Sequence, residues 1–279
     1  MMGSESAVEP YISSIIQACS DPDSGIVSAV LFGSASTGSY SSSVSDVDLL
    51  IVLKDRATAQ DRCRVRDTIS ELEDRSGLGK QYLHRRGAFN AIADRVTLNV
   101  RSFFVCTRGD LLSGDPARIL DITALQALFV DRVAIPSILA SGITIWGENL
   151  LPHVPLPPIR RLDVAKAFFS LFNQALIPVV GYPVLSDATR YAMDTLKRSI
   201  HNCYFVYHSH AAHLAEEAAF FQQRIGANAC PTLAQLMRLR TAYQPSYGFV
   251  LHCLPAIVRL HWITAWQNHF PREPRLAGD

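Results

Sequence analysis

The sequence carries almost no net charge. Lys and Arg total 26 and Asp and Glu total 25, which leaves a formal charge of +1. Proteins that bind long nucleic acid usually carry an excess of basic residues, so we expect no long nucleic acid among the partners. The uncharged stretch 241–258 is interrupted by prolines and polar residues and predicts no membrane span. Because charged residues are 18% and apolar residues 48%, the chain should bury a sizeable core.

Cysteine is sparse and scattered. There are six cysteines, and the closest two in sequence are Cys230 and Cys253. This spacing excludes local CxxC metal or redox motifs and does not suggest a disulfide framework. The N-terminal segment has neither the basic residues nor the apolar block of a secretory signal. We therefore expect a cytoplasmic protein with reduced, ordinarily buried thiols and no membrane contact. The oligomeric state stays open, and a homodimer is one possibility.

Strand and helix patterns alternate in the first half of the chain. Short β-rich apolar runs predict strands at 26–32, 47–53 and 95–107. Helical periodicity predicts amphipathic helices at 7–19, 55–75 and 121–139. This alternation is typical of an α/β (α+β) domain, which we place at residues 1–150.

A proline-rich segment separates the two halves. Residues 151–159 hold four prolines, which fix φ and remove backbone donors, so we predict a stiff linker there. Beyond it, from 160 to 279, the periodicity predicts helices at 162–176, 187–207, 210–224, 232–243 and 250–270. Ser186 and Thr232 stand at expected N-caps and Gly226 at an expected C′ position. The second half should form a helical bundle, with Trp262 and Trp266 packed inside it.

Two acidic residues stand where the second strand begins. Asp46 and Asp48 are separated by one residue, and on a strand such residues point to the same side with Cα atoms about 6.6 Å apart. Val47 between them should face the core, and the following run LLIVL is wholly apolar, as in a buried central strand. A lone pair of this kind is more often only the start of a surface strand. Two carboxylates at this spacing can also converge on one hard divalent cation such as Mg²⁺.

A Gly-Ser step ends the preceding strand. Gly33 lets the backbone approach a ligand closely, and Ser34 opens a Ser-rich stretch in which we expect a short helix. Free N–H groups at a helix N-terminus suit phosphate oxygens. A strand, a Gly-Ser turn, a helix and an Asp-x-Asp strand together predict a phosphate cradle facing a Mg²⁺ site. That arrangement is typical of phosphoryl or nucleotidyl transfer.

The stretch from Val30 to Leu53 resembles the signature of the DNA polymerase β-type nucleotidyltransferase superfamily, hG[GS]…Dh[DE]h. Gly33-Ser34 and Asp46-Val47-Asp48 occupy the matching places. The chain is most similar to the bacterial branch that holds the aminoglycoside and minimal nucleotidyltransferases. Residues 142–148 resemble the element that closes many such domains, so the resemblance covers roughly 25–150. It implies a mixed sheet with helices, followed by a helical domain.

The chain departs from this family where a third carboxylate is expected. Active members usually supply one from a later strand, which corresponds to the run 95–107 here, and that run holds no Asp or Glu. Its polar side chains on the face assigned to the site are Thr97, Asn99 and Arg101. Asn99 can offer a neutral oxygen to a metal but is not a base at neutral pH.

Three explanations stay open for this departure. Asp94 or Asp110 supplies the group, or a carboxylate of the helical domain such as Glu216 or Glu217 does. In the third, the enzyme is weakened or inactive and binds nucleotide without transferring it.

Other polar groups support weaker hypotheses. A cationic run is either a triphosphate contact or a solvated loop: Lys80, His84, Arg85 and Arg86. The HSHAAH segment invites a metal interpretation, but no nearby ligand completes a tetrahedral set. Lys197, Arg198 and His201 lie near tyrosines that form either an acceptor wall or ordinary core.

The function that the resemblance implies is nucleotidyl transfer. A nucleoside triphosphate would bind with Mg²⁺ at Asp46 and Asp48 and with its phosphates at Gly33 and Ser34, while Ser45 hydrogen-bonds nearby. An acceptor hydroxyl would attack the α-phosphorus and pyrophosphate would leave. A small molecule is the expected acceptor. The alternatives are a catalytically degenerate nucleotide-binding module and an enzyme that acts on a protein or tRNA.

Overall fold

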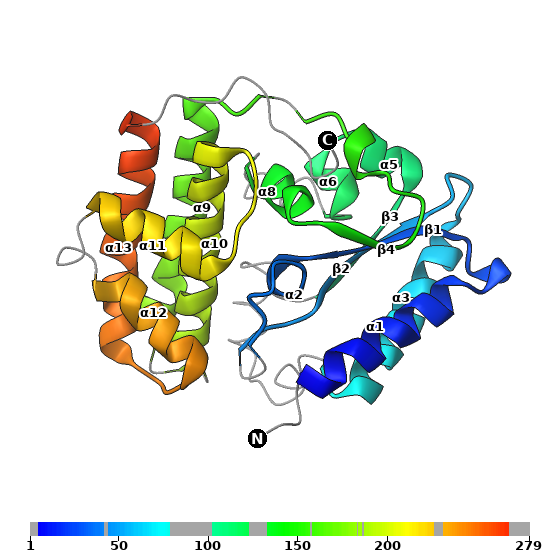
Figure 1. Cartoon of the computed structure of the whole chain (residues 1–279), viewed down its shortest axis with the longest axis horizontal. Helices are drawn as coiled ribbons and strands as arrows, with labels where there is room; N and C mark the ends of the chain where they lie inside the picture. Colours follow the sequence, from blue (N-terminus) through cyan, green and yellow to red (C-terminus); the bar gives the residue numbers. More distant parts are fainter. Residues whose placement is uncertain are drawn as a thin grey trace.

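The protein is described by a computed structural model, which covers residues 5–41, 44–78, 102–122, 133–156, 158–182, 184–185, 187–225 and 231–267. A mixed sheet with helices on both faces makes up the first half, and a bundle of long helices stands beside it (Figure 1). The predicted fold class, an α/β (α+β) domain followed by an all-helical region, is therefore confirmed.

Within the described residues, four strands form the sheet in the order β3-β2-β1-β4. β1 (Ile26–Phe32) pairs antiparallel with β2 (Asp48–Leu53) and with β4 (Ile143–Gly147), whereas β3 (Phe103–Thr107) runs parallel to β2. Because β1 and β2 are central, both of their faces are covered, and their side chains are almost all buried. This explains why the two strands read as continuous apolar runs in the sequence.

The helices divide between the two faces of the sheet (Figure 1). One face packs on α1 (Glu5–Cys19) and α3 (Ala59–Ser76) through a shared core that includes Leu49, Ile51 and Ile69. The other face carries α5 (Arg108–Leu112), α6 (Pro116–Ile119) and α8 (Ala134–Ala140). Strand side chains alternate between these two cores, so the period of two in β2 decides which side each residue serves.

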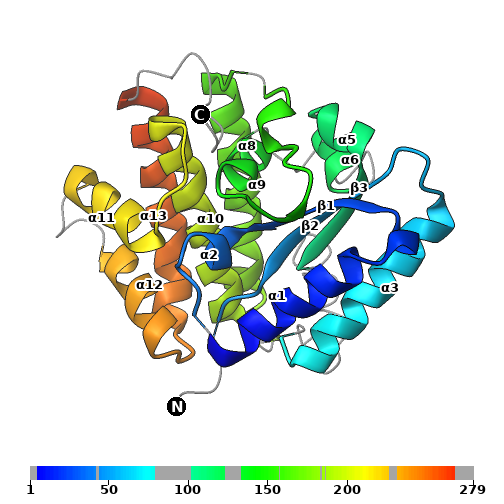
Figure 2. The same cartoon turned by 45° about the vertical axis from the view of Figure 1, so that its right-hand side comes forward.

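Five helices make up the second half. They are α9 (Arg161–Val180), α10 (Ala188–His208), α11 (Leu214–Ile225), α12 (Pro231–Thr241) and α13 (Tyr247–Gln267). They share one core, in which Leu196, Ile200 and Leu236 are fully shielded from solvent. α9, α10 and α13 are the long parallel rods of Figures 1 and 2, and α11 and α12 cross them on the outside. The predicted five-helix pattern is confirmed in number and order across the described part of this half.

Several local expectations were wrong. Asp187, not Ser186, caps α10, and its side chain accepts a hydrogen bond from the Arg190 N–H. Thr232 lies inside α12, because Pro231, which has no N–H to leave unpaired, begins that helix. Asp121 has a left-handed φ of 48° and lies in a turn, so no helix begins there. Gly226 and the part of the predicted third strand before residue 102 lie outside the described residues.

Trp262 and Trp266 are not core residues. Their ring centroids lie 5.5 Å apart with the ring planes tilted by 43°, and each residue is more than 60% exposed. The spacing of four residues correctly indicated that they share a helix face. That face is turned to solvent, because the opposite face, with Phe249, Cys253 and Leu260, packs on α9 and α10.

Two helices are long and apolar enough to cross a membrane, α9 and α13. In each of them 44% of the apolar window is buried inside the protein. Core helices of soluble proteins pass the same test of length and composition. The absence of membrane contact therefore stays a prediction.

The proline-rich segment is partly packed. A short 3-10 turn, Leu151–His153, starts it, and Leu151 and Val154 are buried in the core beneath α5, α6 and α8. The segment is thus anchored to the sheet half at its beginning. The division of the chain into two domains at 151–159 stays a prediction.

Replacing Leu50 by alanine tests the importance of the buried central strand. Leu50 is 2% exposed and packs under α5 and α8. We expect Leu50→Ala to lower the free energy of unfolding by about 2–5 kcal/mol, measured by chemical denaturation. Leu251→Ala, at a site that is 41% exposed, is the matched control and should change it by less than about 0.5 kcal/mol. Equal effects of the two substitutions would contradict the placement of β2.

Candidate active site

The candidate site lies at the end of the sheet where β1 finishes and β2 starts. β1 ends at Phe32, and the one-turn helix α2 (Gly33–Ser36) follows without a break. Phe32 pairs with Asp48, the first residue of β2, so the Gly-Ser step and the acidic pair meet across one rung of the sheet. This end of the sheet faces α10, α11 and α12 of the helical half in both views (Figures 1 and 2).

Gly33 and Asp48 are in direct contact. Gly33 has a φ of 70°, which is in the left-handed region that favours glycine. A Cβ atom at this position would overlap the Oδ2 atom of Asp48 and lie 3.3 Å from its Cγ. Glycine is therefore needed for two reasons, its backbone conformation and the space that the Asp48 carboxylate occupies.

The two acidic residues flank a core residue as predicted. Val47 is 2% exposed and belongs to the core under α1 and α3, together with Leu49. Asp46 and Asp48 are half-buried. Tyr40 approaches the pair: burial, and then the charge of Asp46, raise the pKa of the Tyr40 hydroxyl. Val47 is thus buried in that core, whereas the acidic residues on either side of it are not fully buried.

The backbone and side chain of the Gly-Ser step have different surroundings. The Gly33 N–H donates a hydrogen bond to the Ser141 Oγ at 3.2 Å, which ties the step to the end of α8. Ser34 is 1% exposed, and its hydroxyl has no hydrogen-bond partner among the described residues. A buried hydroxyl without a partner loses its hydration without compensation, so it calls for a ligand or water.

The Ser45 hydroxyl hydrogen-bonds to the loop before the acidic pair and to α12. Its Oγ accepts hydrogen bonds from the Ser41 N–H at 3.0 Å and from the Arg240 guanidinium at 3.1 Å. The Ser45 N–H donates to the Ser41 carbonyl at 2.7 Å. Ser45 therefore closes the turn that leads into Asp46.

One proposed source of a third carboxylate is excluded by position. Asp110 follows β3, and the last residue of that strand, Thr107, pairs with Leu53 at the far end of β2 from Asp48. Burial alone would raise the pKa of Asp110, but hydrogen bonds from Thr107 and the charge of Arg62 outweigh it and lower that pKa. Asp110 is therefore the capping partner of α5, with an Arg62 ion pair at 3.0 Å.

The helical carboxylates are engaged inside their own region. Glu217 has no exposed surface, its Oε2 lies against the Nδ1 of His201, and its Oε1 accepts a hydrogen bond from the Ala212 N–H at 3.2 Å. Glu216 accepts a hydrogen bond from the Tyr204 hydroxyl at 3.4 Å. Asp94, Thr97, Asn99 and Arg101 lie outside the described residues, and so does the cationic run 80–86.

Of the histidines of HSHAAH, His208 and His210 have ring centroids 5.6 Å apart, whereas His213 contacts another segment. The His208 ring packs on Tyr204 at 4.2 Å, and burial, followed by the charges of His210 and Arg224, lowers its pKa. His213 instead contacts the Gly38 carbonyl through its Nε2 at 3.0 Å. Within the described ranges, no group of three or more His, Cys, Asp or Glu side chains comes together to hold a metal.

The tyrosines near Lys197, Arg198 and His201 include Tyr191 and Tyr204, which belong to the helical core.

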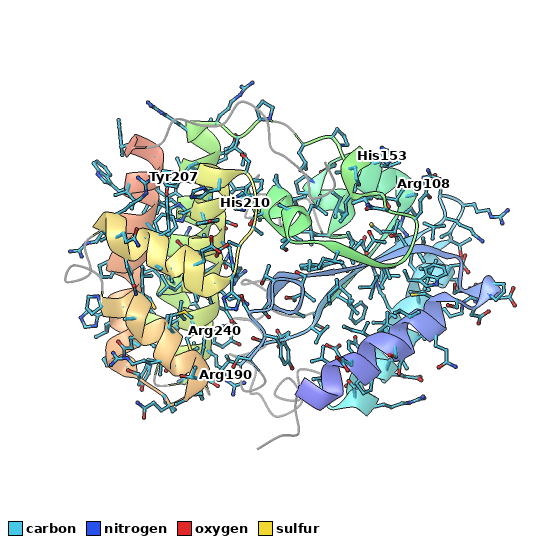
Figure 3. All side chains as sticks on the ribbon, viewed as in Figure 1. Arg108, His153, Arg190, Tyr207, His210 and Arg240 are labelled. Atoms are coloured by element: carbon cyan, nitrogen blue, oxygen red, sulfur yellow. The ribbon has the colours of Figure 1, made fainter. Side chains whose placement is uncertain are left out.

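The sequence interpretation missed one residue that contacts the site loop, Arg240. It lies on α12, is 6% exposed, and donates to the Ser39 carbonyl at 2.5 Å as well as to Ser45. Its position in Figure 3 is where α12 meets the loop. A signal was present: Arg240 falls four residues after Leu236, on the buried stripe of that helix, where an arginine needs a partner.

Comparisons with known proteins agree with this fold. Residues 12–84 match the family model of the nucleotidyltransferase domain. Among solved structures, the chain is similar to spectinomycin adenyltransferase AAD(9) from Enterococcus faecialis, solved with ATP and spectinomycin. The two share 11% sequence identity with a TM-score of 0.56, over 90% of this chain and 98% of that one. No curated protein matches the chain.

These findings concern a segment and the fold. The segment that matches the nucleotidyltransferase domain contains both the Gly-Ser step and the acidic pair. The likeness in fold to the adenyltransferase structure extends through the helical half.

Alanine at Gly33 tests the contact with Asp48. We expect Gly33→Ala to lower the free energy of unfolding by about 2–5 kcal/mol, because left-handed strain and overlap with the carboxylate add. Gly25→Ala is a matched control, since Gly25 has a φ of 69° and nothing within 4 Å of its added Cβ. It should cost only the strain, about 1–2 kcal/mol, in the same denaturation experiment. Equal costs for the two variants would show that Asp48 does not occupy this space.

Asp110→Asn separates a capping role from a catalytic one. The substitution removes the charge that pairs with Arg62 and weakens the cap of α5, so the free energy of unfolding should fall by about 1–3 kcal/mol. Nucleotidyl transfer per folded molecule should stay unchanged, measured as pyrophosphate release. A loss of transfer of about a hundredfold without loss of stability would restore Asp110 as a candidate for the third carboxylate.

Proposed function

We propose that the protein transfers a nucleoside monophosphate from a nucleoside triphosphate to an acceptor hydroxyl, with release of pyrophosphate. The observation that carries the proposal is the contact between Gly33 and the carboxylate of Asp48. It places the glycine backbone of the Gly-Ser step directly beside a half-buried acid, so the expected phosphate-binding turn and a cation-binding group are adjacent. The match of residues 12–84 to the nucleotidyltransferase domain supports it.

The residues present fit a divalent cation. Asp46 and Asp48 supply hard carboxylate oxygens, the ligands that Mg²⁺ prefers, and alternation around Val47 sends both away from the same core. Each also has polar or charged neighbours, so neither is an isolated acid. We therefore assign Asp46 and Asp48 as the residues that would hold Mg²⁺. When bound, the ion would offset the negative charge of the phosphates during transfer.

The chain's own groups would bind and orient the triphosphate. The buried Ser34 hydroxyl, which has no partner among the described residues, is a donor ready for a phosphate oxygen. Gly33 would allow the phosphates to approach the backbone. The Gly33 N–H itself is held by the hydrogen bond that it donates to the Ser141 Oγ. Ser45 keeps the turn before Asp46 closed. Fixed geometry of this kind supplies a large part of catalysis in phosphoryl transfer.

A small molecule is the acceptor that we favour. AAD(9), whose fold this chain shares, is described as an adenyltransferase and was solved with ATP and spectinomycin. The formal charge of +1 argues against tRNA, since nucleic acid binding draws on an excess of basic residues. A nucleotidylating enzyme with a protein acceptor remains the alternative within this activity. We propose ATP as the first nucleotide to test.

A catalytically degenerate nucleotide-binding module is the second candidate function. The observation that favours it is the absence of a third carboxylate near Asp48 in the described part of the chain, since Asp110, Glu216 and Glu217 are engaged elsewhere. Such a protein would bind nucleotide and Mg²⁺ but release no pyrophosphate. The homodimer, the domain division at 151–159 and the cytoplasmic location stay predictions beside either function.

Charge-neutral substitutions of the acidic pair test the proposed site. We expect Asp46→Asn and Asp48→Asn each to reduce pyrophosphate release from Mg²⁺ and ATP by about a hundredfold or more, because a metal ligand is worth several kcal/mol of transition-state stabilisation. Release is measured with α-labelled nucleotides in the presence of a panel of hydroxyl acceptors. Asp67→Asn, an exposed position on α3, is the matched control and should leave release unchanged.

The outcomes separate the candidates. Release by the parent that the two variants lose supports transfer at this site. Binding of ATP and Mg²⁺ by the parent without release, abolished by the same variants, would favour the degenerate module. Release that persists in the double variant would contradict the assignment of Asp46 and Asp48.

A further inference from the structure

We infer that Arg240 of the helical half is a positioning residue for the active site, because its buried guanidinium holds the Ser39–Ser45 turn from which Asp46 emerges. The inference rests on the proposed function and adds a residue that lies about two hundred positions away from the acidic pair in sequence. No nucleotide contact is assigned to Arg240. Its effect would pass through the loop.

The loop between α2 and β2 connects the two parts of the site. It starts after the Gly-Ser step and ends at Asp46, so its conformation decides where the first carboxylate stands relative to the second. Asp48 is already fixed by its place in β2, next to Phe32. Asp46 lies at the end of the loop, two residues before β2 begins. The position of Asp46 therefore depends on how the loop is held.

Arg240 holds this loop at several points. Its guanidinium donates to the Ser39 carbonyl at 2.5 Å and to the Ser45 Oγ at 3.1 Å. Its own carbonyl accepts a hydrogen bond from the Ser41 Oγ at 2.7 Å. The side chain and backbone of Arg240 thus hydrogen-bond to three serines of the loop. One of them, Ser45, directly precedes Asp46.

A second helical contact holds the start of the loop. The Leu214 N–H, at the beginning of α11, donates to the Ser39 Oγ at 3.0 Å, and His213 contacts the Gly38 carbonyl. In Figure 3 Arg240 projects from α12 toward the same segment, so two helices of the bundle meet the loop from one side. The helical half therefore does more than cover the sheet: it determines part of the site's geometry.

The energetics of burial explain why this contact resists loss. Arg240 is 6% exposed, and a buried guanidinium is costly unless its donors are hydrogen-bonded and its charge is compensated. Burial lowers the pKa of Arg240, and the nearby charge of Asp194 on α10 opposes that shift. The guanidinium donates to two acceptors in the loop, the Ser39 carbonyl and the Ser45 Oγ. Releasing the loop would leave part of a buried charge unsatisfied, so the loop is held firmly.

The test compares substitutions on one helix. Arg240→Met keeps the length and apolar stem of the side chain but removes every donor, and Arg240→Lys keeps the charge and some donors. Arg238→Met, at an exposed position two residues earlier on α12, is the matched control. Circular dichroism and thermal unfolding establish that each full-length variant is folded under the assay conditions.

The first readout is hydrogen exchange of the loop. We expect peptides that span 37–46 to exchange at least about tenfold faster in Arg240→Met than in the parent, with exchange in β1 and β2 unchanged, because the two guanidinium contacts to the loop are lost. Arg240→Lys should be intermediate and Arg238→Met should match the parent. Unchanged exchange in Arg240→Met would overturn the inference whatever the activity of the protein.

The second readout is the Mg²⁺ dependence of pyrophosphate release. In Arg240→Met we expect release at saturating ATP to fall about 10–100-fold and the Mg²⁺ concentration for half-maximal release to rise, the size of effect typical of groups that orient metal ligands. Arg240→Lys should recover part of both. Adding Ser45→Ala to Arg240→Met should cause little further loss, because both changes disturb the same turn.

These results distinguish the inference from the proposed function. If the parent releases pyrophosphate and Arg240→Met matches it in rate and Mg²⁺ dependence, the inference fails and the proposed function stands. If the parent releases none, the proposed transfer fails and the exchange result alone decides whether Arg240 holds the loop. A rate loss in Arg240→Met without any change in Mg²⁺ dependence, and with no recovery in Arg240→Lys, would also overturn the positioning role.

Discussion

The close contact between Gly33 and the Asp48 carboxylate is the constraint on which the site depends. It requires β1 and β2 to be antiparallel neighbours in one register, because only that register places the end of one strand opposite the start of the other. The register in turn follows from two cores that receive alternate side chains of β2. A slip of one residue would send Asp48 into the core under α1 and α3 and turn Val47 out.

The two halves of the chain contribute to the site in different ways. The sheet half carries the groups that would contact nucleotide and cation, and its strands hold Asp48 rigidly. The helical half reaches the site through α11 and α12, where Leu214 and Arg240 bind the loop that precedes Asp46. If the acidic pair holds the cation as proposed, its geometry depends on the packing between the halves, so changes in the bundle should affect transfer without touching the substrate.

Much of the fold and the centre of the site could be predicted from local sequence. Apolar runs predicted β1 and β2, and the helical period predicted α9 to α13 in order, because each pattern reflects burial of one element against a common core. The errors concerned helix ends and side-chain exposure. Asp187, not Ser186, caps α10, and Trp262 and Trp266 face solvent. Neither the end of a helix nor the exposure of a side chain is a local property, since both depend on what packs against the segment.

The sequence by itself determined the Gly-Ser step, the acidic pair and the alternation that turns Val47 inward, because these depend on residues a few positions apart. Only the tertiary structure decided that Asp48 lies against Gly33, that Asp110 is at the wrong end of the sheet, and that Arg240 binds the loop. These relations join residues distant in the chain. They are set by strand pairing and helix packing, which no short stretch of sequence encodes.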